Sequence, residues 1–327
     1  MSVMVADFIN YKGKTVAVTG ASGYIGSVLA DALKNRSADV IRVSRGALLP
    51  ETGMTNLQAD VRDYSCWQNI ISKADIIFHL AGITSLYAAA KNPVESLNST
   101  VLPLNHLINV AQELNRVPRV VFASTATIYG ITKDLPVSEA RETHPITLYD
   151  LHKRFAEEQL ALANSQGILQ SVSLRLANVY GPSLNTSSAM DRGVLNKVSK
   201  MALRGEDLQL FGDGNYVRDY IHIDDVVNAF LCAGNLDGFA GRCFNLASGQ
   251  GVTLKEAFQL VINQVAKATG QKVTLNSVPW PVGADLIEYR NFTGDISAIY
   301  DAFNWRPNVS LQAGVEQMVT IFSENDE

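Results

Sequence analysis

Thr15-Val-Ala-Val-Thr-Gly20-Ala-Ser-Gly23-Tyr-Ile-Gly26 joins a run of β-branched residues to a glycine-rich segment. Thr15–Thr19 has the composition of a buried strand. Apolar residues then recur with helical spacing, at Ile25, Val28, Leu29, Ala32 and Leu33. Glycines let a backbone approach a phosphate closely, and the start of a helix offers unpaired N–H groups. This order of strand, glycine turn and helix therefore predicts a site for the pyrophosphate of a dinucleotide.

The rest of the first half alternates short β-branched runs with amphipathic stretches, which is the pattern of βαβ units. Strands are predicted at 40–43, 75–80, 119–124 and 171–176. One predicted helix face carries Val94, Leu97, Val101, Leu104, Leu107 and Ile108, and another helix is predicted at 149–163. We therefore expect an α/β fold with a doubly wound, parallel Rossmann sheet.

After about Ala177 the order becomes rich in turns, which indicates a second, smaller domain. Residues 1–177 are predicted to form the dinucleotide-binding domain. Residues 216–248 are expected to rejoin it, through strands near 220–223 and 243–246. Residues 178–215 and 249–327 are predicted to form an interleaved substrate-binding domain.

The composition limits the function classes. The chain has 327 residues and a formal net charge of -5, which argues against a nucleic-acid binder. Its three cysteines show no zinc or disulfide spacing, so no metal is expected and a reducing cytoplasm is predicted. No apolar run is long enough to span a membrane, and residues 1–14 do not resemble a signal peptide.

The end of the second strand bears on the choice of cofactor. An acidic residue about 20 positions after the glycine loop would bind the ribose of NAD. Ser44 and Arg45 stand there instead and could bind the 2′-phosphate of NADP, the alternative being an arginine at a solvated strand end. Asp60, followed by Val61, could accept a hydrogen bond from the adenine amino group or cap a loop.

Tyr149 and Lys153 are four residues apart on one face of a predicted helix. An ammonium group near a phenol favours the phenolate and lowers the pKa of the phenol. The pair therefore predicts a proton shuttle at Tyr149.

Together these segments resemble the extended short-chain dehydrogenase/reductase family, in its nucleotide-sugar epimerase, dehydratase and reductase branch. The resemblance runs from about Lys14 to Pro307. It is carried by TGASGYIG (19–26), HLAG (79–82), FASTATIYG (122–130), YDLHK (149–153), RLANVYGP (175–182), VRDYIHIDD (217–225) and NWRP (304–307).

The resemblance implies roles for matching residues. It implies that Thr125 acts beside Tyr149 and Lys153 in catalysis. The implied cofactor-binding residues are Gly20, Gly23, Tyr24, Ile25, Gly26, Ser44, Arg45, Asp60, Val61, Leu80, Ala81, Gly82, Thr84, Ser99, Tyr149 and Lys153. The implied substrate-binding residues are Thr84, Ser124, Thr125, Asn178, Gln209, Phe211, Arg218 and Arg290. Two arginines suit a diphosphate, and the aromatic ring of Phe211 can pack on a base.

The family's 4,6-dehydratases usually carry an acid after the catalytic hydroxyl, whereas this chain has Ala126-Thr127-Ile128. The preferred hypothesis is therefore an NAD(P)-dependent nucleotide-sugar 4-epimerase working through a 4-keto intermediate. The alternatives are an NADPH-dependent reductase of a nucleotide-linked 4-keto-deoxysugar and a non-catalytic nucleotide-binding protein. Ser44 and Arg45 favour NADP.

Two further expectations follow from the resemblance. A homodimer is expected through the helices at 94–114 and 151–163. Specificity for the sugar and the base is expected to depend on residues 185–194 and 279–290.

Overall fold

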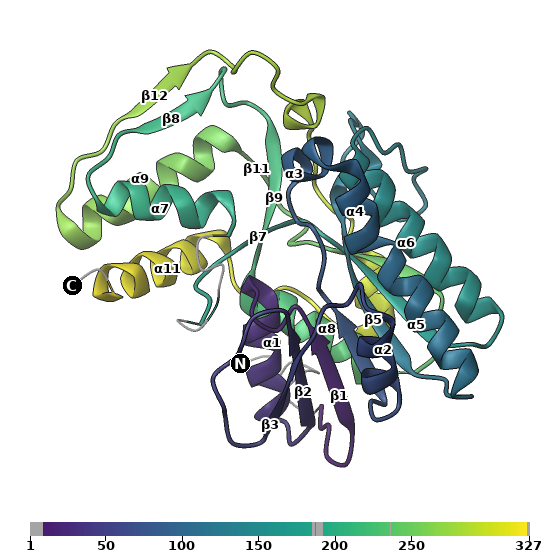
Figure 1. The fold of residues 1–327 in the computed structure, drawn as a ribbon. Helices are drawn as coiled ribbons and strands as arrows, with labels where there is room; N and C mark the ends of the chain where they lie inside the picture. The colour runs from purple at the N-terminus through teal and green to yellow at the C-terminus, as the bar shows by residue number, and fades with distance from the viewer. Residues whose placement is uncertain (1–8, 185–186, 188–191, 236, 326–327) are drawn as a thin grey trace.

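A seven-stranded sheet forms the centre of the computed structural model, which describes residues 9–184, 187, 192–235 and 237–325 (Figure 1). All its strand pairs are parallel, in the order β10-β6-β5-β4-β1-β2-β3. The strands are β1 (Thr15–Thr19), β2 (Asp39–Ser44), β3 (Met54–Gln58), β4 (Ile76–His79), β5 (Arg119–Thr125), β6 (Gln170–Leu176) and β10 (Arg242–Leu246). The strand order reverses between β1 and β4, and open α/β sheets bind ligands at such a point. The predicted doubly wound Rossmann fold is confirmed.

Helices cover both faces of this sheet. One face packs on α1 (Tyr24–Lys34), α8 (Ile223–Asn235) and α10 (Ser297–Phe303). The other packs on α2 (Tyr64–Ile71), α5 (Leu102–Glu113) and α6 (Leu148–Ser165). Because neighbouring strand residues point to opposite faces, Val16 and Val18 enter the first core and Ala17 the second. Burial on both faces explains why the strands of this sheet read as continuous apolar runs.

A second lobe lies on the left in Figure 1. Its strands are β7 (Asn178–Tyr180), β8 (Leu208–Phe211), β9 (Val217–His222), β11 (Gly251–Thr253) and β12 (Leu275–Val278), which form sheets β11-β9-β7 and β12-β8. They pack with α7 (Val194–Leu203), α9 (Leu254–Thr269) and α11 (Leu311–Asn325) around a separate apolar core. A capping box of Thr253 and Glu256 begins α9, and the left-handed Gly270 ends it.

The expectation that both strands of 216–248 rejoin the main sheet is half wrong. β10 pairs with β6 as predicted, but β9 pairs with β7 and β11 in the second lobe. Conversely, Ile299 and Phe303 of α10 lie in the core of the first lobe, although they belong to 249–327. The chain therefore crosses between the lobes more often than the sequence indicated. The domain boundaries themselves stay a prediction.

The single helix face predicted from Val94 to Ile108 is also wrong. Two helices occupy this stretch, α4 (Pro93–Thr100) and α5. Pro103 in the first turn of α5 has no N–H to continue the preceding helix. As a result Val94 and Leu97 are exposed, whereas Leu104 and Leu107 are buried.

Candidate active site

A cleft of about 560 Å³ opens at the carboxyl ends of the parallel strands, between the two lobes. Both lobes line the cleft. The first lobe contributes residues of α1 and β5, and the second contributes residues of β7 and the residues just before α7. It brings together the following predicted residues: Gly20, Gly23, Tyr24, Ile25, Gly26, Ser44, Arg45, Asp60, Val61, Leu80, Ala81, Gly82, Thr84, Ser99, Ser124, Thr125, Tyr149, Lys153 and Asn178.

The glycine loop fits the pyrophosphate of a dinucleotide. Gly20 has φ of 71°, a conformation that favours glycine, and a Cβ on Gly26 would overlap the carbonyl oxygen of Gly20. Gly23 is the N-cap of α1, and no side chain caps the helix there. The first N–H groups of α1 therefore remain available to a phosphate in the cleft.

The two predicted contacts at the adenosine end differ in their surroundings. The buried Ser44 hydroxyl donates to the carbonyl of Gly46 at 2.8 Å, and the exposed Arg45 lines the cleft. Nε of Arg62 donates to both carboxylate oxygens of Asp60 at 3.0 Å, and these hydrogen bonds lower the pKa of Asp60. Arg62 also binds Glu95 at 2.9 Å. The carboxylate expected to meet the adenine amino group is thus already engaged, by an arginine the sequence analysis missed.

Thr125, Tyr149 and Lys153 meet on the opposite wall of the cleft. Thr125 ends β5, and the other two lie in the first turns of α6, which begins at its N-cap Thr147. The hydroxyl of Thr125 lies near enough to the phenol of Tyr149 to lower its pKa. Lys153 Nζ donates to the carbonyl oxygen of Ala123 at 2.7 Å. The structure therefore assembles the predicted trio from two elements far apart in sequence.

The predicted effect of Lys153 on Tyr149 is wrong for this structure. Burial raises the pKa of Tyr149 to about 12, and the neighbouring charge of Asp150 raises it further. The groups that lower it are the hydroxyl of Thr125 and the charge of Arg192. Lys153 is itself desolvated, and burial lowers its pKa to about 8. Adjacency on a helix face did not reveal that Lys153 is buried and Tyr149 half-buried.

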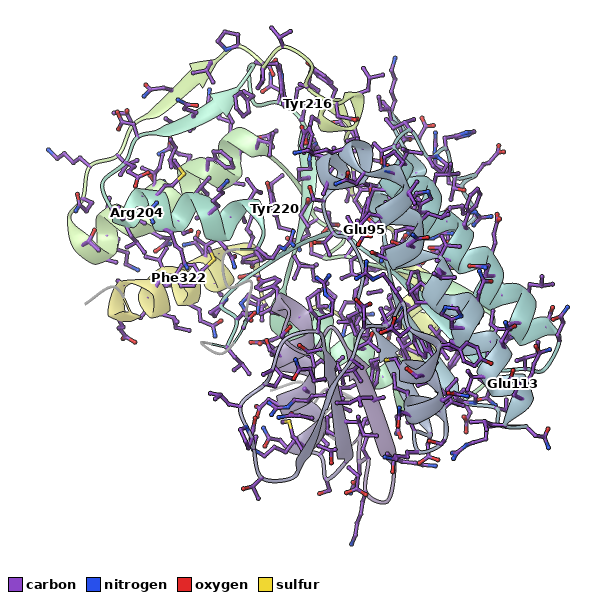
Figure 2. All side chains as sticks on the ribbon, viewed as in Figure 1. Glu95, Glu113, Arg204, Tyr216, Tyr220 and Phe322 are labelled. Atoms are coloured by element: carbon purple, nitrogen blue, oxygen red, sulfur yellow. The ribbon has the colours of Figure 1, made fainter. Side chains whose placement is uncertain are left out.

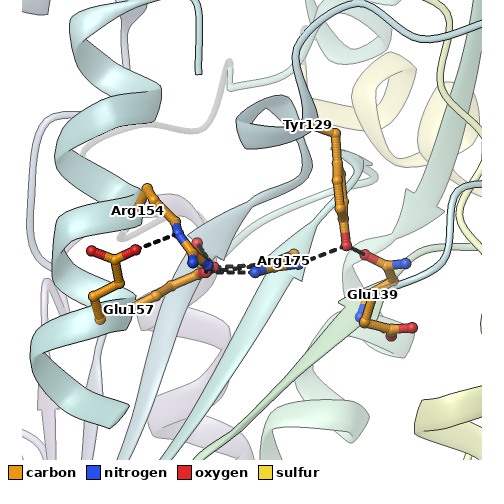
Figure 3. Close-up of polar contacts among 8 residues, drawn as sticks. Tyr129, Glu139, Arg154, Glu157 and Arg175 are labelled. Carbon is orange, nitrogen blue, oxygen red and sulfur yellow. Dashed lines mark hydrogen bonds and ion pairs between the residues drawn. The ribbon is translucent and has the colours of Figure 1, made fainter. Parts of the chain in front are cut away.

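A buried polar network surrounds Glu157 and Arg175 (Figure 3). Ser124 donates to Glu157 at 2.6 Å, and Arg175 binds Glu157 through Nε at 3.0 Å and a terminal nitrogen at 2.8 Å. Arg175 also donates to the hydroxyl of Tyr129 at 2.8 Å, which in turn donates to Asn245. The network joins α6 to β5, β6 and β10 and fixes the direction of the Ser124 hydroxyl.

Four predicted substrate residues stand apart from the cleft lining, in the second lobe. Arg218 is buried and donates to the carbonyl oxygens of Arg290 and, at 2.8 Å, Glu288. Burial and the charge of Arg290 lower the pKa of Arg218 to about 10. Across the residues that the structure describes, no carboxylate forms an ion pair with either arginine. Two neighbouring guanidinium groups that make no direct ion pair among the described residues suit an anionic ligand, although the charge of Glu288 acts on both.

The other two, Gln209 and Phe211, lie on β8. Gln209 is exposed. The ring of Phe211 stacks on Trp280 with centroids 5.3 Å apart, and Tyr216 and Tyr289 pack against the same indole (Figure 2 labels Tyr216). Trp280 lies in the segment 279–290 that was predicted to determine specificity, but it was not singled out because this segment has no repeating pattern. Of the specificity segment 185–194, residues 185–186 and 188–191 lie outside the described residues, whereas Arg192, Gly193 and Val194 line the cleft.

The residues that the structure describes contain no group of histidine, cysteine and acidic side chains that could hold a metal ion. They also contain no helix long and apolar enough to cross a membrane.

A Rossmann sheet with a glycine loop after β1 and a Thr–Tyr–Lys trio beside it defines a dinucleotide-dependent enzyme of the short-chain dehydrogenase/reductase class. Within that class, the chain belongs to the NAD-dependent epimerase/dehydratase family, whose model matches residues 16–247. The family predicted from the sequence motifs is confirmed.

Individual relatives cover nearly the whole chain. A UDP-glucose 4-epimerase of Mycolicibacterium smegmatis is 28% identical over 93% of this chain and 97% of its own length. The crystal structure of UDP-glucose 4-epimerase with UDP-glucose from Thermotoga maritima has a TM-score of 0.85 and 28% identity, covering 96% of this chain and all of that one (100%). MoeE5 in complex with UDP-glucuronic acid and NAD has a TM-score of 0.82 and 26% identity, with coverage of 96% and 100%.

Proposed function

We propose that this protein is a nucleotide-sugar 4-epimerase that uses a tightly held nicotinamide dinucleotide. The observation that carries the proposal is the meeting of Thr125, Tyr149 and Lys153 on one wall of the cleft that the glycine loop of β1 opens. Of the relatives named above, two are UDP-glucose 4-epimerases and the third is in complex with UDP-glucuronic acid, and their similarity over nearly the whole chain supports the same substrate class here.

The residues of the cleft divide the chemistry among them. The glycine loop and Lys153 would hold a nicotinamide dinucleotide, which would supply the hydride chemistry needed at C4 of the sugar. Tyr149 removes the proton of the C4 hydroxyl and later gives it back. Thr125, at the end of β5 in the cleft lining, stabilises the charge that develops on O4. Lys153, whose ammonium group donates to the carbonyl oxygen of Ala123, would orient the nicotinamide ribose.

The second lobe supplies the charges and surfaces for a nucleotide. Arg218 and Arg290 are placed to receive the diphosphate, since they lack carboxylate partners among the described residues. The Phe211–Trp280 stack offers an aromatic surface to the base. Thr84, Ser124 and Asn178 would contact the sugar side, and Gln209, exposed on β8, the nucleotide.

The function is tested with purified protein and a panel of UDP-hexoses and UDP-hexuronic acids. Native mass spectrometry first identifies the retained dinucleotide. An epimerase converts substrate to its C4 epimer without net consumption of cofactor. Stoichiometric oxidation of NADPH with a 4-keto sugar would instead establish the reductase alternative, which Ser44 and Arg45 favour.

The cofactor preference makes a quantitative prediction. We propose that NADP binds better than NAD, because Arg45 lines the cleft and no acidic residue stands at the end of β2. Arg45→Ala is expected to weaken NADP binding about tenfold, the effect of one lost charge-assisted hydrogen bond, and to leave NAD binding unchanged. Titration of the dinucleotide-free protein measures both. Equal affinity of the unaltered protein for NAD and NADP would contradict the preference.

Apolar side chains on neighbouring helices support a homodimer. Val94 on α4 is 70% exposed, and Leu162 on α6 is 59% exposed, with Phe155 one heptad earlier on the same face. Phe155→Glu is expected to shift a dimer to monomer in light scattering coupled to gel filtration. Leu49→Glu, at another exposed apolar residue, is the matched control and should leave the mass unchanged. A monomeric unaltered protein would refute the dimer.

We propose a reducing, cytoplasmic compartment. Cys66 and Cys232 are buried free thiols, and Cys243 is also unpaired. Burial raises the pKa of each thiol, so none is a reactive thiolate.

A further inference from the structure

Tyr24, the first residue of α1, carries a phenol that contacts the second lobe. The residue is 7% exposed. Its hydroxyl donates to the carbonyl oxygen of Gly181 at 2.7 Å and accepts from the side-chain amide of Asn196 at 3.3 Å. Gly181 directly follows β7, and Asn196 lies in the first turn of α7. One residue of the glycine loop is thus bonded to two elements of the other lobe.

A second contact joins the backbone of the same residue to this part of the second lobe. The Ser183 hydroxyl donates to the carbonyl oxygen of Tyr24 at 2.9 Å. It also lies 3.3 Å from the hydroxyl of Ser27, one turn further along α1. The first turn of α1 therefore holds the residues after β7 through both its side chains and its main chain.

Gly181 and Asn196 in turn fix the start of α7. The Asn196 side chain accepts from the N–H of Gly181 at 3.0 Å and donates to its carbonyl oxygen at 2.8 Å, and Asn196 is fully buried. A Cβ on Gly193 would lie only 2.6 Å from the carbonyl oxygen of Val179, so the backbone before α7 packs directly on β7. Residues 192–194 line the cleft and take their position from these contacts.

The other end of this connection is the proposed phosphate site. The N–H of Tyr24 is among the first N–H groups of α1, which no side chain caps. A pyrophosphate bound to these groups would restrain the residue whose hydroxyl holds Gly181. When one ligand restrains a segment, a second ligand that needs the same segment loses less conformational entropy on binding.

We propose that Tyr24 is a positioning residue that couples the dinucleotide site to the nucleotide-sugar site. A dinucleotide on the glycine loop holds Gly181 and the start of α7 in place for the nucleotide sugar. By linkage, the nucleotide sugar tightens dinucleotide binding by the same factor. The inference rests on the proposed function, because it requires both ligands in one cleft, and it gives the proposed tight retention of the dinucleotide a structural cause.

The test uses two ligands that are too short to touch each other. ADP-ribose has the adenosine and pyrophosphate of the dinucleotide without a nicotinamide, and UDP has the nucleotide of the substrate without a sugar. Saturating ADP-ribose should tighten UDP binding to the dinucleotide-free protein about tenfold, within the usual range for coupling between two sites. Equal UDP affinity with and without ADP-ribose would overturn the proposal.

Tyr24→Phe removes the hydroxyl and keeps the ring. ADP-ribose alone should bind this variant as tightly as the unaltered protein, because the N–H groups of α1 remain. The effect of ADP-ribose on UDP affinity should fall from about tenfold to less than about twofold, since the bonds between the lobes are lost.

Tyr11→Phe is the matched control. The Tyr11 hydroxyl is also buried and donates to a carbonyl oxygen at 2.7 Å, but its partner is Leu231 on α8 of the first lobe. This variant should lose as much thermal stability as Tyr24→Phe and keep the coupling. Coupling that persists in Tyr24→Phe, or that both variants lose, would show that Tyr24 has only a structural role. The comparison within the unaltered protein decides even if a variant fails to fold.

Hydrogen–deuterium exchange supplies a readout that needs no second ligand. ADP-ribose should slow amide exchange in α7 of the unaltered protein and leave it unchanged in Tyr24→Phe. Exchange in α7 that ignores ADP-ribose in the unaltered protein would overturn the coupling. If UDP fails to bind while ADP-ribose still protects α7, the proposed substrate class fails and the coupling stands.

Discussion

Tyr149→Phe is expected to lower kcat about 1,000-fold, while the protein still retains its dinucleotide and binds nucleotide sugar. The variant removes one oxygen, which is the proposed proton carrier for the C4 hydroxyl, from the lining of the cleft. Positioned acid–base groups contribute on the order of 100- to 10,000-fold to enzymatic rates. The phenyl ring keeps the shape of the cleft wall, so binding should persist.

The measurement is single-turnover formation of reduced nicotinamide, together with product analysis after long incubation. Tyr64→Phe removes a phenolic oxygen from α2, outside the cleft lining, and should retain full turnover. Turnover by Tyr149→Phe at the rate of the unaltered enzyme would remove Tyr149 from the mechanism.

The second large effect concerns stability. Glu157→Gln is expected to lower the free energy of unfolding by about 3 kcal/mol, because it leaves the guanidinium of Arg175 buried without its counter-charge. The side chains of Glu157 and Arg175 are only 2% and 4% exposed, so water cannot replace the lost interaction. The reoriented amide also disturbs Ser124, so kcat should fall with stability.

Glu158→Gln is the matched control for this prediction. Glu158 is the next residue on α6 and binds Arg154 at 2.9 Å, but its side chain is 57% exposed. Exposed ion pairs contribute about 0.5 kcal/mol or less, so this variant should unfold almost like the unaltered protein. Urea unfolding followed by circular dichroism measures both. Equal effects of the two substitutions would mean that burial does not set the strength of the Glu157–Arg175 pair.

Local sequence patterns predicted most strands of the first lobe because these strands are buried on both faces. Thr15–Thr19 matches β1 residue for residue, and the strand at 119–124 differs from β5 by one position. β3 escaped prediction because Met54–Gln58 lies at an edge with mostly exposed side chains, which leaves no alternating pattern. Composition therefore identified the buried strands, including β10 at the other edge, and missed the exposed edge strand β3.

The site shows the same division between local and long-range information. The motif spacing placed Tyr149, Lys153 and Thr125 in one cleft, since each motif ends a strand or begins a helix. It could not reveal that Arg62 binds the carboxylate of Asp60. Nor could it reveal that Thr127, on the turn that follows β5, donates a hydrogen bond to Asp150. These contacts depend on how distant elements pack. Burial, which also depends on packing, raises the pKa of Tyr149, whereas the sequence predicted a lowered pKa.

The alternation of the chain between the lobes has a consequence for dissecting the protein. The strand β10 and the helices α8 and α10 complete the first lobe, yet all three follow β9 of the second lobe in sequence. A fragment ending near Ala177 would expose β6 as an unpaired edge and uncover the apolar surface that Phe230 and Phe303 fill. The two lobes should therefore unfold in a single cooperative transition, and neither can be exchanged as a genetic module by one crossover.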